Sequence, residues 1–305
     1  MARNARILRL GDGRALGYAE WGDPGGRAVL ELHGNPGGRL LLWDEEILER
    51  EGVRLITADR PGVGLSDSQA GRRVLDWPRD VAELVDALGI DRFAVIGFSV
   101  GGVYAAACAH GLPERVSAVA LVSSIVPFDP PAPFEAVGNS GYWRLSRRVP
   151  RIAALGLGAQ TTLSRAWPGL AAKAFARGLS AADRELVGRR PEVVLRGIEQ
   201  IGDAIRPGAR GLVEDLRIVM GPWGFPLEGI GVPTVVWQGT DDGSIPTAWG
   251  ERLADAIPGA RLRACPSEGH LLIADRLAEI LAGLDDMPSQ PGRGGGGAEH
   301  AAGDV

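Results

Sequence analysis

Cysteine, lysine and long apolar runs are scarce in this chain, and each scarcity excludes a class of protein. The two cysteines, Cys108 and Cys265, are too few for a disulfide framework and are not spaced like metal ligands. Lys173 is the only lysine, and a net charge of −5 leaves no basic footprint for nucleic acid. No apolar run reaches the roughly 18–20 residues that span a bilayer, and the N-terminus lacks a signal-peptide core. We therefore expect a cytoplasmic protein with no membrane span, no metal and no cofactor.

Glycine, by contrast, is abundant, and two glycines flank the most informative serine. Gly97-Phe-Ser-Val-Gly101 follows the β-prone run Arg92–Ile96 and precedes the small-residue stretch Gly102–Ala109. A serine on such a strand-to-helix turn stands above the sheet, at a helix N-terminus that favours negative charge. Side chains in place of the two glycines would collide with the neighbouring strand and helix. The pattern predicts that Ser99 is a nucleophile.

A serine nucleophile needs a base, and this chain has four histidines. His300 ends a low-complexity tail, and His33 belongs to a separate motif. His110 ends the helix that Ser99 begins, about 16 Å away at a rise of 1.5 Å per residue. Elimination therefore selects His270, which also lies near the end of the folded part, as the chain order nucleophile, acid, histidine requires.

The acid that orients this histidine should follow a strand between the serine and the histidine. Val232–Gln238 has the pattern of a buried strand, and Asp241 and Asp242 come just after it. Either carboxylate could reach an imidazole N–H, so the chemistry alone leaves both open. The preceding strand, which ends at Val122, leads into Ser123-Ser124 and offers no carboxylate.

Five motifs follow strand-like runs in a fixed order: His33–Gly37, Asp59–Asp67, Gly97–Gly101, Gly239–Pro246 and Glu268–His270. In spacing and order they resemble the motifs of the α/β-hydrolase superfamily, and the chain is similar to its cap-bearing, haloperoxidase- and esterase-like bacterial branch. The resemblance covers about residues 5–127 and 230–285. It is highly specific for the fold and much less so for the substrate.

The resemblance implies roles that the residues alone leave open. The spacing G-x-x-D-x-x-x-P, which begins at Gly239, selects Asp242 as the acid and leaves Asp241 as a solvated neighbour. The backbone N–H groups of Asn35 and Val100 would form an oxyanion hole, whose two donors stabilise the negative charge of the transition state.

His33 and Arg60 each have a structural and a functional interpretation. We expect His33 to brace its loop rather than to act as a second base. We expect Arg60 to stabilise a rigid turn, the alternative being that it faces the substrate.

Strand-like and helical stretches alternate along residues 1–127 and 230–285. This alternation predicts an α/β core with a mostly parallel central sheet flanked by helices, among them Leu40–Glu51 and Pro78–Leu88. After Pro127 the apolar spacing becomes helical, which predicts an α-helical cap insertion over residues 128–229. Residues 286–305 are rich in glycine and proline, and we expect a disordered tail there.

The cap segment leaves two questions open. Residues 128–230 hold 14 Lys or Arg against 10 Asp or Glu, which suits either a lid that attracts anionic substrates or a solvated helical surface. Phe98, Trp223 and Phe225 are candidates for the wall of a substrate pocket. The aromatic residues at 223 and 225 could equally staple the cap to the core.

We expect the protein to hydrolyse a small ester or related acyl compound through Ser99, His270 and Asp242, by way of an acyl-enzyme. The haloalkane dehalogenases and epoxide hydrolases of this fold use an aspartate nucleophile, so a serine at this position argues against both activities. Prolyl iminopeptidases share the H-G-x-P-G loop but usually carry tryptophan where this chain has Val100. Iminopeptidase, carbon–carbon bond hydrolase, lactonase and perhydrolase activities stay open, as do the oligomeric state and a ligand-binding protein that retains the triad without turnover.

The paired aspartates generate a first prediction. If Asp242 orients His270, Asp242→Asn should lower kcat by roughly 10⁴-fold, as in other serine triads. Asp241→Asn is the matched control and should cost far less. Steady-state kinetics on one activated ester compares the two variants, and the reverse ranking would move the acid to position 241.

Overall fold

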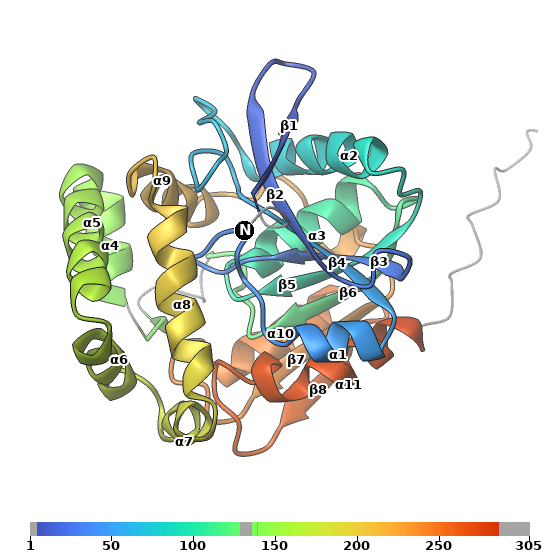
Figure 1. Cartoon of the computed structure of the whole chain (residues 1–305). Helices are drawn as coiled ribbons and strands as arrows, with labels where there is room; N and C mark the ends of the chain where they lie inside the picture. Colours follow the sequence, from blue (N-terminus) through green and yellow to red (C-terminus); the bar gives the residue numbers. More distant parts are fainter. Residues whose placement is uncertain (1–4, 129–135, 139, 287–305) are drawn as a thin grey trace, which may run out of the picture.

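A mostly parallel, eight-stranded sheet forms the centre of the computed structural model, which describes residues 5–128, 136–138 and 140–286 (Figure 1). The strand order is β1-β2-β4-β3-β5-β6-β7-β8, with antiparallel pairing of β1 with β2 and of β2 with β4, and parallel pairing from β4 to β8. The predicted α/β class is confirmed. The strands are β1 Arg6–Arg9, β2 Ala15–Gly22, β3 Arg27–Leu32, β4 Val53–Ala58, β5 Phe93–Phe98, β6 Val116–Val122, β7 Thr234–Gly239 and β8 Arg261–Cys265.

Helices cover both faces of this sheet, which explains why its central strands are apolar without interruption. Every residue of β5 and β7 is buried. Residues of α2, α3 and α10 join the core on one face, and residues of α1 and α11 join it on the other. The bounds are α1 Glu45–Arg50, α2 Trp77–Ala87, α3 Gly101–Gly111, α10 Thr247–Ala256 and α11 Ile273–Asp285, with short 3₁₀ turns η1 Val74–Asp76 and η3 Leu227–Gly229.

The helix expected over Leu40–Glu51 begins later than predicted. The Asp44 side chain accepts the backbone N–H of Ile47 at 3.3 Å and caps α1, which starts at Glu45. Residues 40–43 are therefore outside the helix, and their apolar side chains are free to line another surface.

Between β6 and β7 the described residues form helices and no strand. We refer to residues 140–219 as the helical insertion; Figure 1 shows its helices gathered on one side of the sheet. Proline occupies the first position of α5, α6 and α8, where the missing N–H costs no hydrogen bond. The helices are α4 Ser140–Arg148, α5 Pro150–Ala166, α6 Pro168–Arg177, α7 Ala181–Arg189, α8 Pro191–Ala204 and α9 Arg210–Val219.

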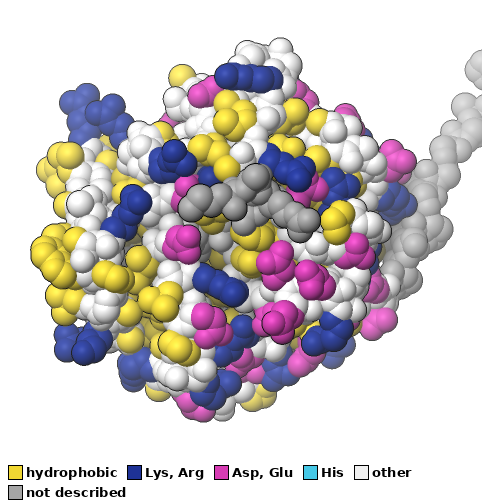
Figure 2. Space-filling model, in the orientation of Figure 1, with side chains coloured by type: hydrophobic (Ala, Val, Ile, Leu, Met, Phe, Trp, Pro, Cys, Tyr) yellow, Lys and Arg dark blue, Asp and Glu magenta, His cyan; other side chains and the backbone are white. Residues whose placement is uncertain are grey.

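Large apolar side chains are exposed mainly on the helical insertion. Leu155, Trp167 and Leu170 are among the most exposed, and Figure 2 shows the corresponding apolar surface at the left of the molecule. The tail expected over 286–305 lies, from residue 287 onward, outside the described residues.

The turn between β5 and α3 needs both of its glycines. Ser99 has a φ of 55°, in the left-handed region. A Cβ on Gly97 would lie 2.6 Å from the Gly102 Cα, and a Cβ on Gly101 would lie 1.9 Å from the Leu32 carbonyl oxygen. Both neighbours are backbone atoms, so the predicted collision with helix and strand is confirmed.

This packing predicts that Gly101→Ala lowers the free energy of unfolding by about 1–3 kcal/mol, as overpacking of a core usually does. Gly156→Ala is the control, because nothing lies within 4 Å of its added methyl group in α5. Alanine there should leave stability unchanged or raise it by about 0.5–1 kcal/mol. Urea denaturation followed by tryptophan fluorescence measures both, and equal stabilities would contradict the packing.

Candidate active site

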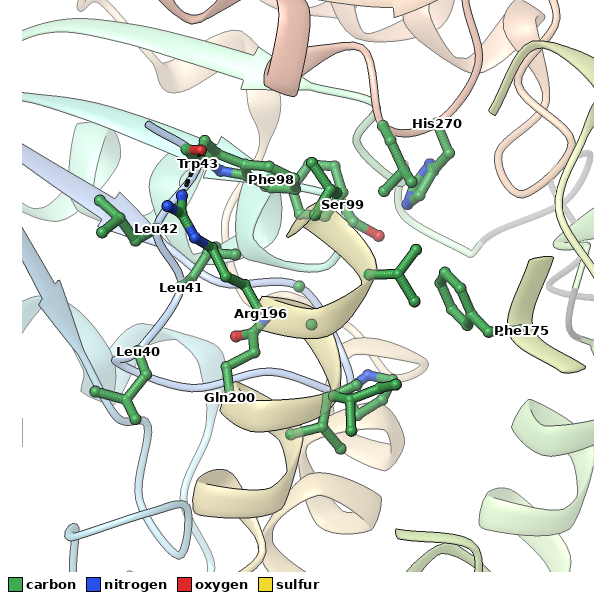
Figure 3. Close-up of a pocket in the computed structure, with 18 of the residues that line it drawn as sticks. Leu40, Leu41, Leu42, Trp43, Phe98, Ser99, Phe175, Arg196, Gln200 and His270 are labelled. Atoms are coloured by element: carbon green, nitrogen blue, oxygen red, sulfur yellow. Dashed lines mark hydrogen bonds between the residues drawn. The ribbon is translucent and has the colours of Figure 1, made fainter. Parts of the chain in front are cut away.

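Ser99 lies in the turn that connects the end of β5 to the start of α3. Its backbone N–H donates to the Val122 carbonyl at 2.9 Å, which ties the turn to the end of β6. The side chain is nearly buried, with 8% of the residue exposed, and it lines a pocket that His270 also lines. In Figure 3 the Ser99 hydroxyl is turned toward the His270 ring.

His270 and Asp242 form the direct contact at this site. The imidazole Nδ1–H donates to Asp242 Oδ2 at 3.0 Å, and the Asp242 side chain is fully buried. The backbone N–H groups of Ser244 and Ile245 both donate to Asp242 Oδ1 at 2.8 Å. Asp241 is exposed, so the structure brings Asp242 rather than its neighbour to the histidine.

Opposing effects act on the pKa of His270. Burial favours the neutral ring and lowers the pKa, while the Asp242 carboxylate, helped by Asp183, stabilises the imidazolium and raises it. The carboxylates prevail, so the pKa of His270 lies above its ordinary value of 6.5. For Asp242, burial opposes ionisation, but His270 and the backbone donors hold the pKa below its usual range.

Arg60 anchors the loop after β3 through hydrogen bonds to its backbone. The fully buried guanidinium donates to the carbonyl oxygens of His33 at 2.6 Å and Gly34 at 3.0 Å, and it pairs with Asp215 of α9 at 2.7 Å. Arg60 therefore braces this loop and does not face the pocket. Asn35, whose N–H is one of the expected oxyanion donors, lines the pocket and donates its side-chain amide to the Leu212 carbonyl at 2.8 Å.

His33 is buried and contacts its own loop. Its Nδ1 lies 2.8 Å from the Gly34 carbonyl oxygen. Burial, reinforced by the nearby charge of Arg60, lowers the pKa of His33 to about 3, so the ring is neutral at physiological pH. Val100, the other expected oxyanion donor, is buried directly after Ser99 at the start of α3.

The pocket has a volume of about 210 Å³ and is mostly apolar. Phe98 lies between Trp43 and His270, with ring centroids 5.1 and 5.0 Å away. Arg196 of α8 also borders the pocket and donates to the Trp43 carbonyl at 2.9 Å (Figure 3). The aliphatic and aromatic lining consists of Pro36, Leu40, Leu41, Leu42, Trp43, Phe98, Phe175, Val193, Val194, Ile198, Ile201 and Leu271.

Trp223 and Phe225 are not among the residues that line this pocket, so of their two possible roles the structure favours packing over walling a substrate site. Phe225 stacks on His110 with ring centroids 5.0 Å apart, and Trp223 donates its indole N–H to the Val219 carbonyl at 3.1 Å. His110 lies at the far end of α3 from Ser99. The segment after α9 therefore packs against the C-terminal end of α3, whereas Ser99 lies at its N-terminal end.

Sequence reasoning missed several of the residues that line the pocket. The sequence predicts a helix over residues 40–43, which lie outside α1, and it predicts only helical structure for the segment that contains α8. The apolar spacing of Val194, Ile198 and Ile201 along α8 is the signal that could have revealed this wall. Within the described parts of the chain, no group of three His, Cys, Asp or Glu side chains could hold a metal ion. No described helix is long and apolar enough to cross a membrane.

Comparison with known proteins agrees with the observed fold. A family model described as "alpha/beta hydrolase fold" matches residues 27–277. The uncharacterized hydrolase YcgS of Bacillus subtilis is 24% identical, covering 86% of this chain and 90% of its own. A proline iminopeptidase of Neisseria gonorrhoeae is 27% identical over 90% of this chain and 92% of its own. An esterase structure from Exiguobacterium antarcticum superposes with a TM-score of 0.66 at 18% identity, over 92% of this chain and 98% of that one.

The electrostatics of the site predict the titration of His270. Its pKa should lie above 6.5 in the folded protein, because the Asp242 carboxylate outweighs burial. Asp242→Asn should lower that pKa, since burial then acts with much less opposition. NMR titration of the imidazole resonances, assigned with a His270→Gln variant, measures both values. A wild-type pKa below 6.5 would show that burial prevails.

Proposed function

The chain is a hydrolase of the α/β-hydrolase family, and from this premise we propose that it cleaves a small ester or related acyl compound through Ser99, His270 and Asp242. The observation that carries the proposal is the 3.0 Å contact between Asp242 and a histidine that shares a pocket with Ser99. A serine on a left-handed turn, a histidine and a buried carboxylate are the parts that acyl transfer requires.

In the proposed mechanism, the Ser99 oxygen attacks the acyl carbon while His270 takes its proton. Asp242 holds the ring through Nδ1 and stabilises the imidazolium that forms. The N–H groups of Asn35 and Val100 donate to the oxyanion of the tetrahedral intermediate. His270 then returns its proton to the leaving alcohol. Water, deprotonated by His270, attacks the acyl-enzyme and releases the acid and free Ser99.

The lining of the pocket supports an apolar acyl group. Aliphatic and aromatic side chains from residues 40–43 and from α8 surround the space next to Ser99. In this proposal the helical insertion acts as a cap, since α8 and Phe175 of α6 supply one wall. The substrate would be held mainly by apolar contact, with few polar groups to orient it.

The charge of the pocket favours an ester over a peptide with a free amino end. A cationic amine needs a carboxylate partner, and among the described residues no Asp or Glu lines this pocket. Its permanently charged neighbour is Arg196, which would repel the amine. An iminopeptidase activity, the kind named for the Neisseria relative, therefore fits this pocket less well.

The proposal predicts that a fluorophosphonate probe labels the protein covalently at Ser99. Ser99→Ala should abolish labelling and lower kcat/KM on p-nitrophenyl esters by at least about 10³-fold, because the triad acts as a unit. Ser68→Ala, which changes an exposed serine outside the pocket, is the matched control and should label normally. An unlabelled wild-type protein would favour a ligand-binding role. Proline naphthylamide and a lactone, assayed beside the esters, separate the alternative substrates.

A further inference from the structure

The buried carboxylate of Asp183 contacts the main chain of the histidine loop from the helical insertion. Asp183 lies in the first turn of α7 with 1% of its surface exposed. Its Oδ2 accepts the backbone N–H of His270 at 3.0 Å, and its Oδ1 accepts that of Leu271 at 2.8 Å. The Ser180 hydroxyl donates to the same carboxylate at 2.9 Å. Two donors of the histidine loop thus depend on one side chain of α7.

The main chain of His270 is held from its other side as well. The Ser123 hydroxyl, just after β6, donates to the His270 carbonyl oxygen at 3.1 Å. With the ring bonded to Asp242, the histidine has one anchor each on its N–H, its carbonyl and its imidazole. Asp183 supplies the anchor on the N–H, and it alone comes from the helical insertion.

The start of α7 packs closely against two glycines, one in the histidine loop and one next to Asp242. A Cβ on Gly269 would lie 2.4 Å from the Asp183 carboxylate carbon, so a side chain there would displace it. A Cβ on Gly243, next to Asp242, would lie 3.2 Å from the Ser180 Cβ. The first turn of α7 therefore sits against both the loop of the base and the loop of the acid (Figure 1).

We infer that Asp183 is a positioning residue for His270, and that α7 must be seated on the core for the base to be aligned with Ser99. This inference rests on the proposed function, in which His270 is the base. Asp183 does not line the pocket, so it acts through the histidine loop and not on the substrate. A displacement of a catalytic group by about 1 Å can cost 10²-fold in rate, which makes such an anchor consequential.

The charge of Asp183 provides a readout that a purely structural contact would lack. Asp242 and Asp183 are the carboxylates that raise the pKa of the His270 imidazole against burial. In Asp183→Asn the amide keeps one acceptor for the two N–H donors and turns its NH₂ group toward the other. The variant therefore loses an anchor and a negative charge together.

For Asp183→Asn we expect kcat on a p-nitrophenyl ester to fall by roughly 10- to 100-fold, as misplacement of the base requires. KM should change less than about threefold, because the apolar side chains of residues 40–43 and α8 that line the pocket are unchanged. The pKa of His270, measured by NMR, should fall below the wild-type value. Arg189→Gln is the matched control: it breaks the 3.0 Å ion pair from the same helix to Asp275 of α11 and leaves the histidine loop untouched. It should keep the wild-type kcat and pKa.

The outcomes separate this inference from the proposed function. If the wild-type protein neither hydrolyses esters nor labels, the proposed function fails, and the NMR pKa still tests Asp183 without any turnover. Wild-type kcat and pKa in Asp183→Asn, or an equal loss of kcat in Arg189→Gln, would overturn the inference. If circular dichroism shows that Asp183→Asn is unfolded, Ser180→Ala replaces it. That variant loosens the carboxylate but keeps its charge, so kcat should drop several-fold, and an unchanged kcat would overturn the inference.

Discussion

A buried carboxylate is stable only where hydrogen-bond donors or cations surround it, and this requirement organises the structure around Ser99. Asp242 meets it with the His270 ring and two backbone N–H groups. Asp215 meets it with Arg60, Arg72 and the Tyr104 hydroxyl, and these cations hold its pKa well below the ordinary value although burial opposes them.

Because the donors around each buried carboxylate come from other parts of the chain, each carboxylate links distant segments. Asp242 joins the loop after β7 to the loop after β8, and Asp215 joins α9 to the loops after β3 and β4 through Arg60. Asp183 joins α7 to the histidine loop. Glu31 shows the contrast: burial raises its pKa to about 8, since the Trp43 indole donor alone opposes that effect weakly. Among Asp242, Asp215 and Glu31, the two carboxylates with several donors have lowered pKa values, and the one with a single donor has a raised pKa.

Two of these links, those of Asp215 and Asp183, come from the helical insertion. Through Asp215 and Arg60 it supports the loop that carries Asn35, and through Asp183 it supports the main chain of His270. Its helix α8 supplies one wall of the pocket. On that wall Arg196 carries the charge and Gln200 is polar, while the other side chains are apolar, which suits the proposed apolar acyl substrate.

Local sequence determined the parts of this protein that depend on neighbouring residues. The strand–turn–helix around Ser99, the glycines that permit it and the parallel sheet follow from patterns a few residues long, and the scarcity of histidine pointed to His270. The tertiary structure decided the rest, because burial and contact depend on residues far apart in the chain. It brought residues 40–43 into the pocket, and it stacked Phe225 on His110 and packed Trp223 beside Phe225. It also paired Asp183 with a backbone 87 positions away and Asp215 with an arginine 155 positions away. In the sequence each is an ordinary acidic residue of a helical stretch, and only the folded chain shows which donors surround it.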